Sequence, residues 1–186
     1  MTKKILENSC IIYNIKYIPI LILGCTISFS NRILKIACGG MHSLTLRNDS
    51  SLWAIGGNSC GELGKGDSFN TNSWVCVSTG VKEIACGWYH SLAIKIDDTL
   101  WATGCNFFGQ LGNDNNRNLN WTCVLNDVKN IACGAFYSLA IKNDDTLWVT
   151  GDNRRRQLGK GDTNNTNSWV CVLTDIKDIA CGIYHS

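Results

Sequence analysis

Short runs of apolar residues, separated by clusters of glycine, asparagine and aspartate, fill the chain from residue 33 onward. Residues 82–85, 91–95, 100–103 and 121–124 are examples, each of strand length and at least half apolar. The two aspartates at 97–98 supply turn chemistry between the second and third runs, because aspartate tolerates a left-handed backbone and bonds its own backbone. No window shows the sustained 3.6-residue apolar period and caps of a helix. The pattern predicts four short β-strands and no helix.

The same pattern recurs along the chain. Residues 81–104 and 128–151 are close copies, residues 33–56 are a looser copy, and residues 176–186 begin a fourth. Each full repeat unit continues beyond these bounds and closes with a Trp-x-Cys-Val run. A four-stranded unit cannot bury both faces alone, so it must stack against its copies, as β-propeller blades do. We expect an all-β fold, a partial β-propeller forming an open arc of three to four four-stranded antiparallel blades. The expected blades are residues 33–80, 81–127, 128–175 and, in part, 176–186.

Three submotifs follow one another in a fixed order. Ala-Cys-Gly-x-x-His-Ser-Leu-Ala-Ile precedes Asp-Thr-Leu-Trp-Ala-Thr-Gly, which precedes Asn-x-x-Gly-Gln-Leu-Gly. In this order the chain resembles the regulator of chromosome condensation repeat family over residues 26–186. The resemblance implies a propeller of four-stranded blades, typically seven in that family. It also implies two functions: guanine-nucleotide exchange on a small GTPase, as in the founding member, or partner binding through loops, as in β-lactamase-inhibiting propellers with similar repeats.

Three full units fall short of the ~4 blades with which the smallest propellers close. We expect a fragment of a longer product, with self-assembly of copies through open edges as the alternative. Residues 1–25 are an apolar leader, interpreted as a signal segment, as a lipoprotein segment with a cleavage box at residues 22–25 that ends at Cys25, or as a disordered start. Residues 26–30 lie one period before residues 74–78 and are candidates for a degenerate closing strand.

Eleven cysteines and a net charge of +2 restrict the function classes. The charge is too small to indicate nucleic-acid binding. Cys-x-x-Cys is absent, and an odd number of cysteines cannot pair completely, so a cytoplasmic location is favoured over a secreted or membrane-anchored one. Because the cysteines recur with the structural period, we predict that they are small buried hydrophobes. The cysteines of the two series are Cys38, Cys86, Cys133 and Cys181, and Cys76, Cys123 and Cys171.

Two motifs resemble a phosphate-binding loop and a nucleophile–base pair, but neither has the residues or spacing that the chemistry requires. The Gly-Lys pairs at 64–65 and 159–160 lack the first glycine of a phosphate loop and the Ser or Thr after lysine. His42, His90 and His185 each precede a serine, but neighbours on a strand point to opposite faces and cannot pair. Because the third copy has Tyr137 in this position, we predict a structural hydrogen bond from each ring. We expect no enzyme, no metal and no cofactor.

Residues that differ between the copies are the candidates for a contact surface, because scaffold positions must repeat. One variable pair lies between the recurring glycine and the His or Tyr, and a second variable loop follows the third strand. Arg156 in this loop replaces a glycine, at a position that favours positive φ. We predict a non-enzymatic scaffold that binds another protein, with nucleotide exchange on a small GTPase as the alternative. The candidate partner-binding residues are Trp88, Tyr89, Phe107, Phe108, Phe136, Arg154, Arg155, Arg156 and Tyr184.

Overall fold

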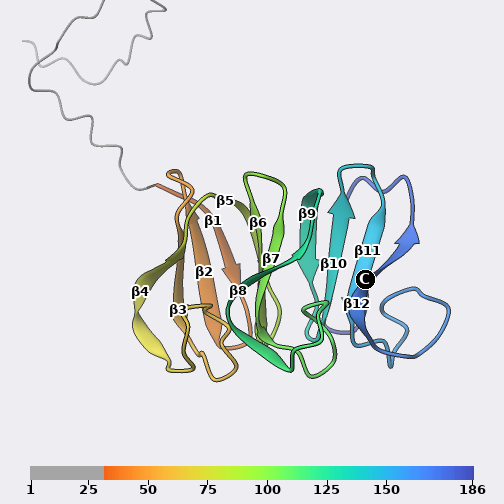
Figure 1. The fold of residues 1–186 in the computed structure, drawn as a ribbon, viewed down its shortest axis with the longest axis horizontal. Coiled ribbons are helices and arrows are strands. Elements are labelled where there is room, and N and C mark those ends of the chain that lie inside the picture. Colours follow the sequence, from red (N-terminus) through yellow and green to blue (C-terminus); the bar gives the residue numbers. More distant parts are fainter. Residues whose placement is uncertain (1–31) are drawn as a thin grey trace, which may run out of the picture. The chain divides into compact units, whose positions relative to one another are not determined.

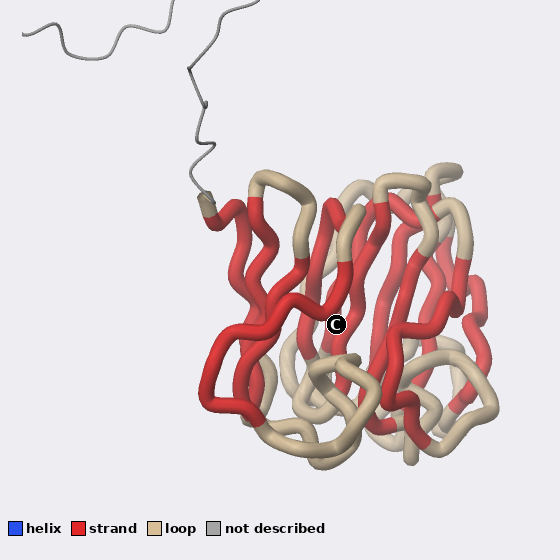
Figure 2. Tube along the Cα trace, turned by 60° about the vertical axis from the view of Figure 1, so that its left-hand side comes forward, coloured by secondary structure: helices blue, strands red, loops and turns tan. Residues whose placement is uncertain are grey.

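The structure, a computed structural model, describes residues 32–186, and its regular elements are all β-strands. Twelve strands form three four-stranded antiparallel sheets, each built from consecutive strands. Figure 1 shows the sheets standing side by side in chain order, and Figure 2 shows the longer loops gathered at one end of the strands. The strands are β1 Ile33–Cys38, β2 His42–Arg47, β3 Leu52–Gly56, β4 Thr71–Ser78, β5 Val81–Cys86, β6 His90–Lys95, β7 Leu100–Cys105, β8 Arg117–Leu125, β9 Val128–Cys133, β10 Tyr137–Lys142, β11 Leu147–Gly151 and β12 Thr166–Leu173.

The all-β class and the four-stranded unit are confirmed. Within residues 32–186 the three blades do not close into a ring, and the beginning of the fourth copy at 176–186 forms no strand. The hairpin aspartates are turn formers, as predicted. Asp98 adopts a φ of 64°, and the Asp97 carboxylate accepts bonds from the Thr99 amide at 3.1 Å and the Thr99 hydroxyl at 2.6 Å.

Successive blades pack through the first strand of each repeat. Val81 and Ile84 of β5 lie in one apolar cluster with Leu44 and other core residues of the first sheet. Both are only 1% exposed, whereas their equivalents in β1, Ile33 and Ile36, are 48% and 58% exposed. Each sheet therefore buries its apolar face against the following repeat, and one face of the first sheet is uncovered among the described residues.

The Gly-x-x-His-Ser motif joins neighbouring sheets. His42 Nε2 lies 2.8 Å from Ser91 Oγ, and His90 Nε2 lies 2.9 Å from Ser138 Oγ. Ser91 Oγ donates to the carbonyl of Glu62 at 2.8 Å, so it accepts its bond from the His42 Nε2–H. The predicted structural bond is confirmed for His42 and His90, but each of these rings bonds the serine of the next repeat rather than the one beside it in sequence.

Glycine precedes these rings because they fold back over it. A Cβ at Gly87 would overlap Cε1 of His90 and lie 2.7 Å from the carbonyl oxygen of Gly134. A Cβ at Gly134 would overlap the ring of Tyr137, whose hydroxyl donates to the Gly182 carbonyl at 3.0 Å. The tyrosine thus takes the histidine's place by bonding the backbone of the following copy instead of a serine.

The prediction that the recurring cysteines are buried is wrong for one series and holds only in part for the other, in which Cys86, Cys133 and Cys181 are half-buried. Cys76, Cys123 and Cys171 are free and exposed, because β4, β8 and β12 are the last strands of their sheets and leave one face to solvent. Cys38, on the uncovered β1, is exposed as well.

Part of the sequence prediction concerns residues outside the described range. The leader at 1–25, its cleavage box at Cys25 and the degenerate strand at 26–30 all lie there. Within residues 32–186, no helix has the length and apolar character needed to cross a membrane.

Candidate functional site

The variable pairs lie on a ladder of hydrogen-bonded turns that runs across the repeats. The Gly40 amide donates to the Trp88 carbonyl at 3.1 Å, and the Trp88 amide donates to the Ala135 carbonyl at 3.1 Å. The Ala135 amide continues the series to the Ile183 carbonyl at 3.4 Å. The side chains that differ between copies are therefore presented on a backbone whose position is fixed by its neighbours.

Aromatic rings from two repeats meet at Phe136. The Phe136 ring centroid lies 5.0 Å from that of Phe108 and 5.5 Å from that of Trp88, the latter in an edge-on arrangement. Tyr89 stacks on the same ring at 6.2 Å. Pairs at these separations contribute about 0.5–1.5 kcal/mol each beyond their area burial. Two variable loops of the second repeat and one of the third are joined at this ring.

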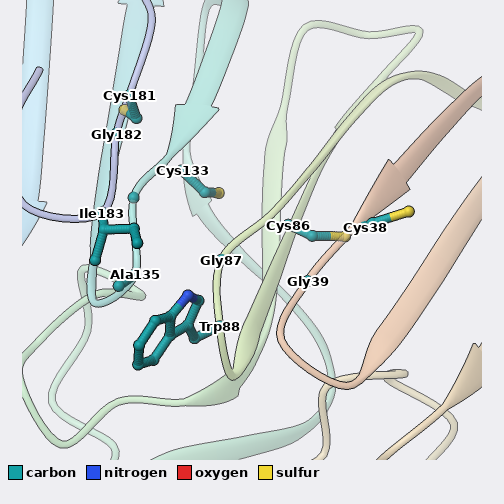
Figure 3. Close-up of a pocket in the computed structure, with 11 residues that line it drawn as sticks. Cys38, Gly39, Cys86, Gly87, Trp88, Cys133, Ala135, Cys181, Gly182 and Ile183 are labelled. Carbon is teal, nitrogen blue, oxygen red and sulfur yellow. The ribbon is translucent and has the colours of Figure 1, made fainter.

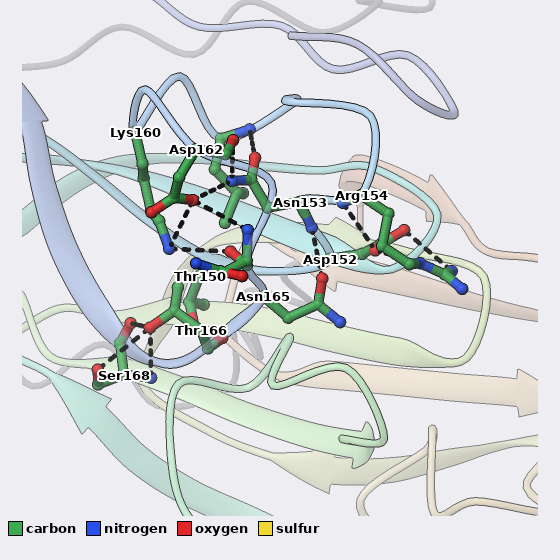
Figure 4. Close-up of polar contacts among 11 residues, drawn as sticks. Thr150, Asp152, Asn153, Arg154, Lys160, Asp162, Asn165, Thr166 and Ser168 are labelled. Atoms are coloured by element: carbon green, nitrogen blue, oxygen red, sulfur yellow. Dashed lines mark hydrogen bonds and ion pairs between the residues drawn. The ribbon is translucent and has the colours of Figure 1, made fainter.

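Arginines border the rings on the side of the third repeat. The Arg154 guanidinium lies 4.5 Å over Phe108, and its Nε and Nη2 bond the two carboxylate oxygens of Asp152 at 2.7 and 3.2 Å (Figure 4). Asp152 is 2% exposed. Its burial alone would raise its pKa, but the hydrogen bonds and charge of Arg154 outweigh burial and hold that pKa below its ordinary value. Arg155 lies 4.7 Å over the ring of Tyr184.

The arginine loop is anchored by the asparagine of the Asn-x-x-Gly-Gln-Leu-Gly motif. Asn153 is fully buried, and its side-chain oxygen accepts from the Leu158 amide at 3.0 Å. Its side-chain nitrogen donates to the backbone carbonyl of Asp162 at 2.9 Å, and its backbone amide donates to Asn165 Oδ1 at 2.9 Å. One side chain thus fixes both ends of the loop, which explains why this asparagine recurs in each copy.

A cavity of about 330 Å³ opens between the rings and the arginines, lined by Phe136, Asp152, Arg154, Arg155 and Tyr184. The structure brings together seven of the nine predicted site residues. We call them the aromatic–arginine cluster: Trp88, Tyr89, Phe108, Phe136, Arg154, Arg155 and Tyr184.

Two of the predicted residues lie outside this cluster. Phe107 is 72% exposed and lines a different hollow, formed mainly by the asparagines of residues 113–116 and 165–167. Arg156 is exposed and takes part in none of the ring contacts that define the cluster. Asp152, which orients Arg154, was missed by the sequence analysis; its separation of two residues from that arginine was the available signal.

Arg156 adopts a φ of 63°, in line with the sequence prediction, where the equivalent Gly61 and Gly109 have φ values of 91° and 85°. A left-handed backbone costs a residue with a side chain roughly 1–2 kcal/mol. We expect Arg156→Gly to raise the free energy of unfolding by up to about 1 kcal/mol, after the greater chain entropy of glycine is counted. Urea denaturation measures this. Arg155→Gly, at a position where φ is not positive, is the control, and an equal gain from both variants would contradict the assignment.

The histidine–serine pairs are not arranged for nucleophilic catalysis. Ser91 and Ser138 are fully buried, and each hydroxyl proton goes to a backbone carbonyl. His90 Nδ1 is buried without a hydrogen-bond partner, so no acid orients the ring as a base. These groups hold blades together.

Cysteines of the four copies line another cavity, of about 270 Å³, formed at the ends of β1, β5 and β9 and beside Cys181 (Figure 3). Burial raises the pKa of Cys86 to about 12 and that of Cys181 to about 11, so both are protonated thiols at neutral pH. Within the described part of the chain, no three His, Cys, Asp or Glu side chains are placed to hold a metal ion.

Comparison with known proteins agrees with this architecture. Residues 81–110 and 128–157 match the model of the regulator of chromosome condensation (RCC1) repeat. The crystal structure of human WBSCR16 is 25% identical, with a TM-score of 0.74 over 82% of this chain and 43% of that one. Prp20p from Saccharomyces cerevisiae, described with its binding to Gsp1p and histones, is 20% identical, with a TM-score of 0.70 over 77% of this chain and 39% of that one. Yeast RCC1 (Prp20) with Kap60 bound is also 20% identical, with a TM-score of 0.71 over 82% and 40%. The chain spans about two fifths of the length of these structures.

Proposed function

Because the chain contains regulator of chromosome condensation repeats folded as propeller blades, we propose that it is a non-enzymatic module that binds another protein through the aromatic–arginine cluster. The observation that carries the proposal is the meeting of the variable side chains. These side chains come from three successive copies and lie together, whereas the residues that recur in the copies bond one blade to the next.

The composition of the cluster supports protein binding. Tryptophan, tyrosine and arginine are the side chains enriched among binding hot spots. Here Trp88 and Tyr184 are exposed at the surface, and Arg154 is already oriented by Asp152. A surface ordered before binding loses less side-chain and loop entropy on association.

Nucleotide exchange on a small GTPase is the second candidate. It rests on the family's founding activity and on the likeness of this fold to that of Prp20p, whose structure is described with its binding to Gsp1p. Purified chain that accelerates nucleotide release from a small GTPase would favour this candidate over a module that only binds.

We expect Phe136→Ala to weaken partner binding by at least about 30-fold, the loss that corresponds to a hot spot of 2 kcal/mol. Its ring is the one that contacts Trp88, Tyr89 and Phe108 together. The partner is first captured with the wild-type chain, and the purified pair is then titrated by calorimetry.

Phe69→Ala is the matched control, because this ring is 74% exposed and belongs to the first repeat. Its binding should equal that of the wild type. If Phe136→Ala binds as tightly as Phe69→Ala while both remain folded by circular dichroism, the contact surface lies elsewhere.

A further inference from the structure

Positive charge gathers on one side of the aromatic–arginine cluster. Arg154, Arg155 and Arg156 are consecutive and exposed, and Asp152 is the only acidic residue that lines the adjoining cavity. Arg154 is paired with Asp152, whereas Arg155 and Arg156 form no ion pair with any residue of the described range 32–186. Two positive charges are left without an acidic partner at this edge.

The guanidinium groups are oriented to receive oxygen acceptors. Arg155 lies over Tyr184 and Arg154 over Phe108. Stacking occupies the faces of a guanidinium and leaves the N–H groups at its edges for a carboxylate, which an arginine can bind through two parallel bonds. Arg154 uses two of its five N–H donors on Asp152, and its side chain is 59% exposed.

The rings beside the arginines provide an apolar seat. The cavity of about 330 Å³ is at the lower end of the ~300–1,000 Å³ range of small-molecule pockets, so it suits a single side chain rather than a large ligand. Phe136 lines it and is backed by Trp88, Tyr89 and Phe108. If an apolar side chain of a bound peptide occupied this cavity, the residues beside it in the peptide would lie next to Arg154 and Arg155.

From this arrangement we infer that the partner docks through an acidic peptide segment, in which an aspartate or glutamate flanks an apolar side chain. The apolar side chain enters the cavity at Phe136, and the carboxylate bonds Arg155 and the outer N–H groups of Arg154. This inference rests on the proposed binding function and specifies its chemistry.

A nucleic acid fits the same surface less well. Bases stack on aromatic rings, but single-strand binding also requires a positively charged groove that follows successive phosphates. The chain has a net charge of only +2, and its unpaired arginines here lie in one loop. Charge complementarity therefore favours a short acidic stretch of protein.

Selection from a phage-displayed library of random 12-residue peptides tests the inference. We expect the wild-type chain to enrich peptides with an acidic residue beside an apolar one, and Arg155→Glu to bind these peptides at least 10-fold more weakly. Lys177→Glu is the matched control, because it makes the same charge change at an exposed site. Lys177 follows Ile176, which bonds the hairpin turn at Asp145, at the opposite end of the sheet.

The selected peptides are then resynthesised with Asn and Gln in place of Asp and Glu. Binding of the amide versions should fall at least 10-fold, and binding of the acidic versions should weaken as NaCl is raised. The inference would be overturned by undiminished binding of the amide peptides, by equal or tighter binding of a single-stranded oligonucleotide, or by no enriched peptide at all. Peptides without acidic residues that still depend on Phe136 would overturn it while leaving the proposed function intact.

Discussion

Gly87→Ala should lower the free energy of unfolding by about 3 kcal/mol or more, the upper end of the cost of overpacking a closely packed site. The new methyl group would overlap the ring of His90 and lie 2.7 Å from the carbonyl oxygen of Gly134. The ring cannot move away without losing its bond to Ser138. Urea denaturation followed by tryptophan fluorescence measures the loss. Since small domains are stable by only about 5–15 kcal/mol, a loss of about 3 kcal/mol removes roughly a fifth to three fifths of that stability.

Two variants separate this clash from a general cost of replacing glycine. Gly80→Ala meets nothing within 4 Å and carries only the strain of a φ of 68°, so it should cost about 1–2 kcal/mol. In a His90→Ala background the penalty of Gly87→Ala should shrink, because the ring that it strikes is gone. Additive penalties in the double variant would show that the ring is not the obstacle.

Stability should also fall steeply as the pH drops below about 6.5. Burial lowers the pKa of His42 to about 4; burial, and then the charge of His42, lower that of His90 to about 3. Between pH 6.5 and 4 the unfolded chain binds protons at both sites and the native chain does not. The free energy of unfolding therefore decreases as the pH falls, by about 1.4 kcal/mol per pH unit for each histidine.

Denaturation midpoints at pH 7.5, 6.5 and 5.5 measure this slope above the range in which aspartates titrate. His90→Gln should remove about half of the slope, since one of the two buried imidazoles is then absent. A flat stability profile between pH 7.5 and 5.5 would mean that the two rings are not buried in their neutral form.

The strands and turns were predictable because they depend on neighbours in sequence. The left-handed Asp98, the hairpin beside it and the places of the four strands in the second repeat follow from local residues, although β8 begins at Arg117, four residues before the predicted run at 121–124. The bond from His42 to Ser91 was not predictable, because it depends on how one sheet is placed against the next, 49 residues away. The exposure of Cys76 was missed for a related reason: the sequence does not say which strand ends a sheet.

The candidate site was predictable as a set of loops but not ring by ring. Variation between the copies identified Phe107 and Phe108 together, and only the fold of the loop decides that Phe108 faces Phe136 while Phe107 points to solvent. The pairing of Arg154 with Asp152 could not be predicted either, because it depends on the folded backbone, which buries the Asp152 carboxylate and brings the Arg154 guanidinium beside it.

Aromatic ¹H–¹³C NMR spectra of the free chain and of its complex test most directly whether the variable loops form one preorganised contact surface. The structure predicts nuclear Overhauser contacts from Phe136 to Trp88 and to Phe108 before any partner is added, and selective shifts of the same rings when it binds. Absence of those contacts in the free chain, or a bound partner that leaves the resonances of these three rings unshifted, would contradict the claim that the variable loops form one preorganised contact surface.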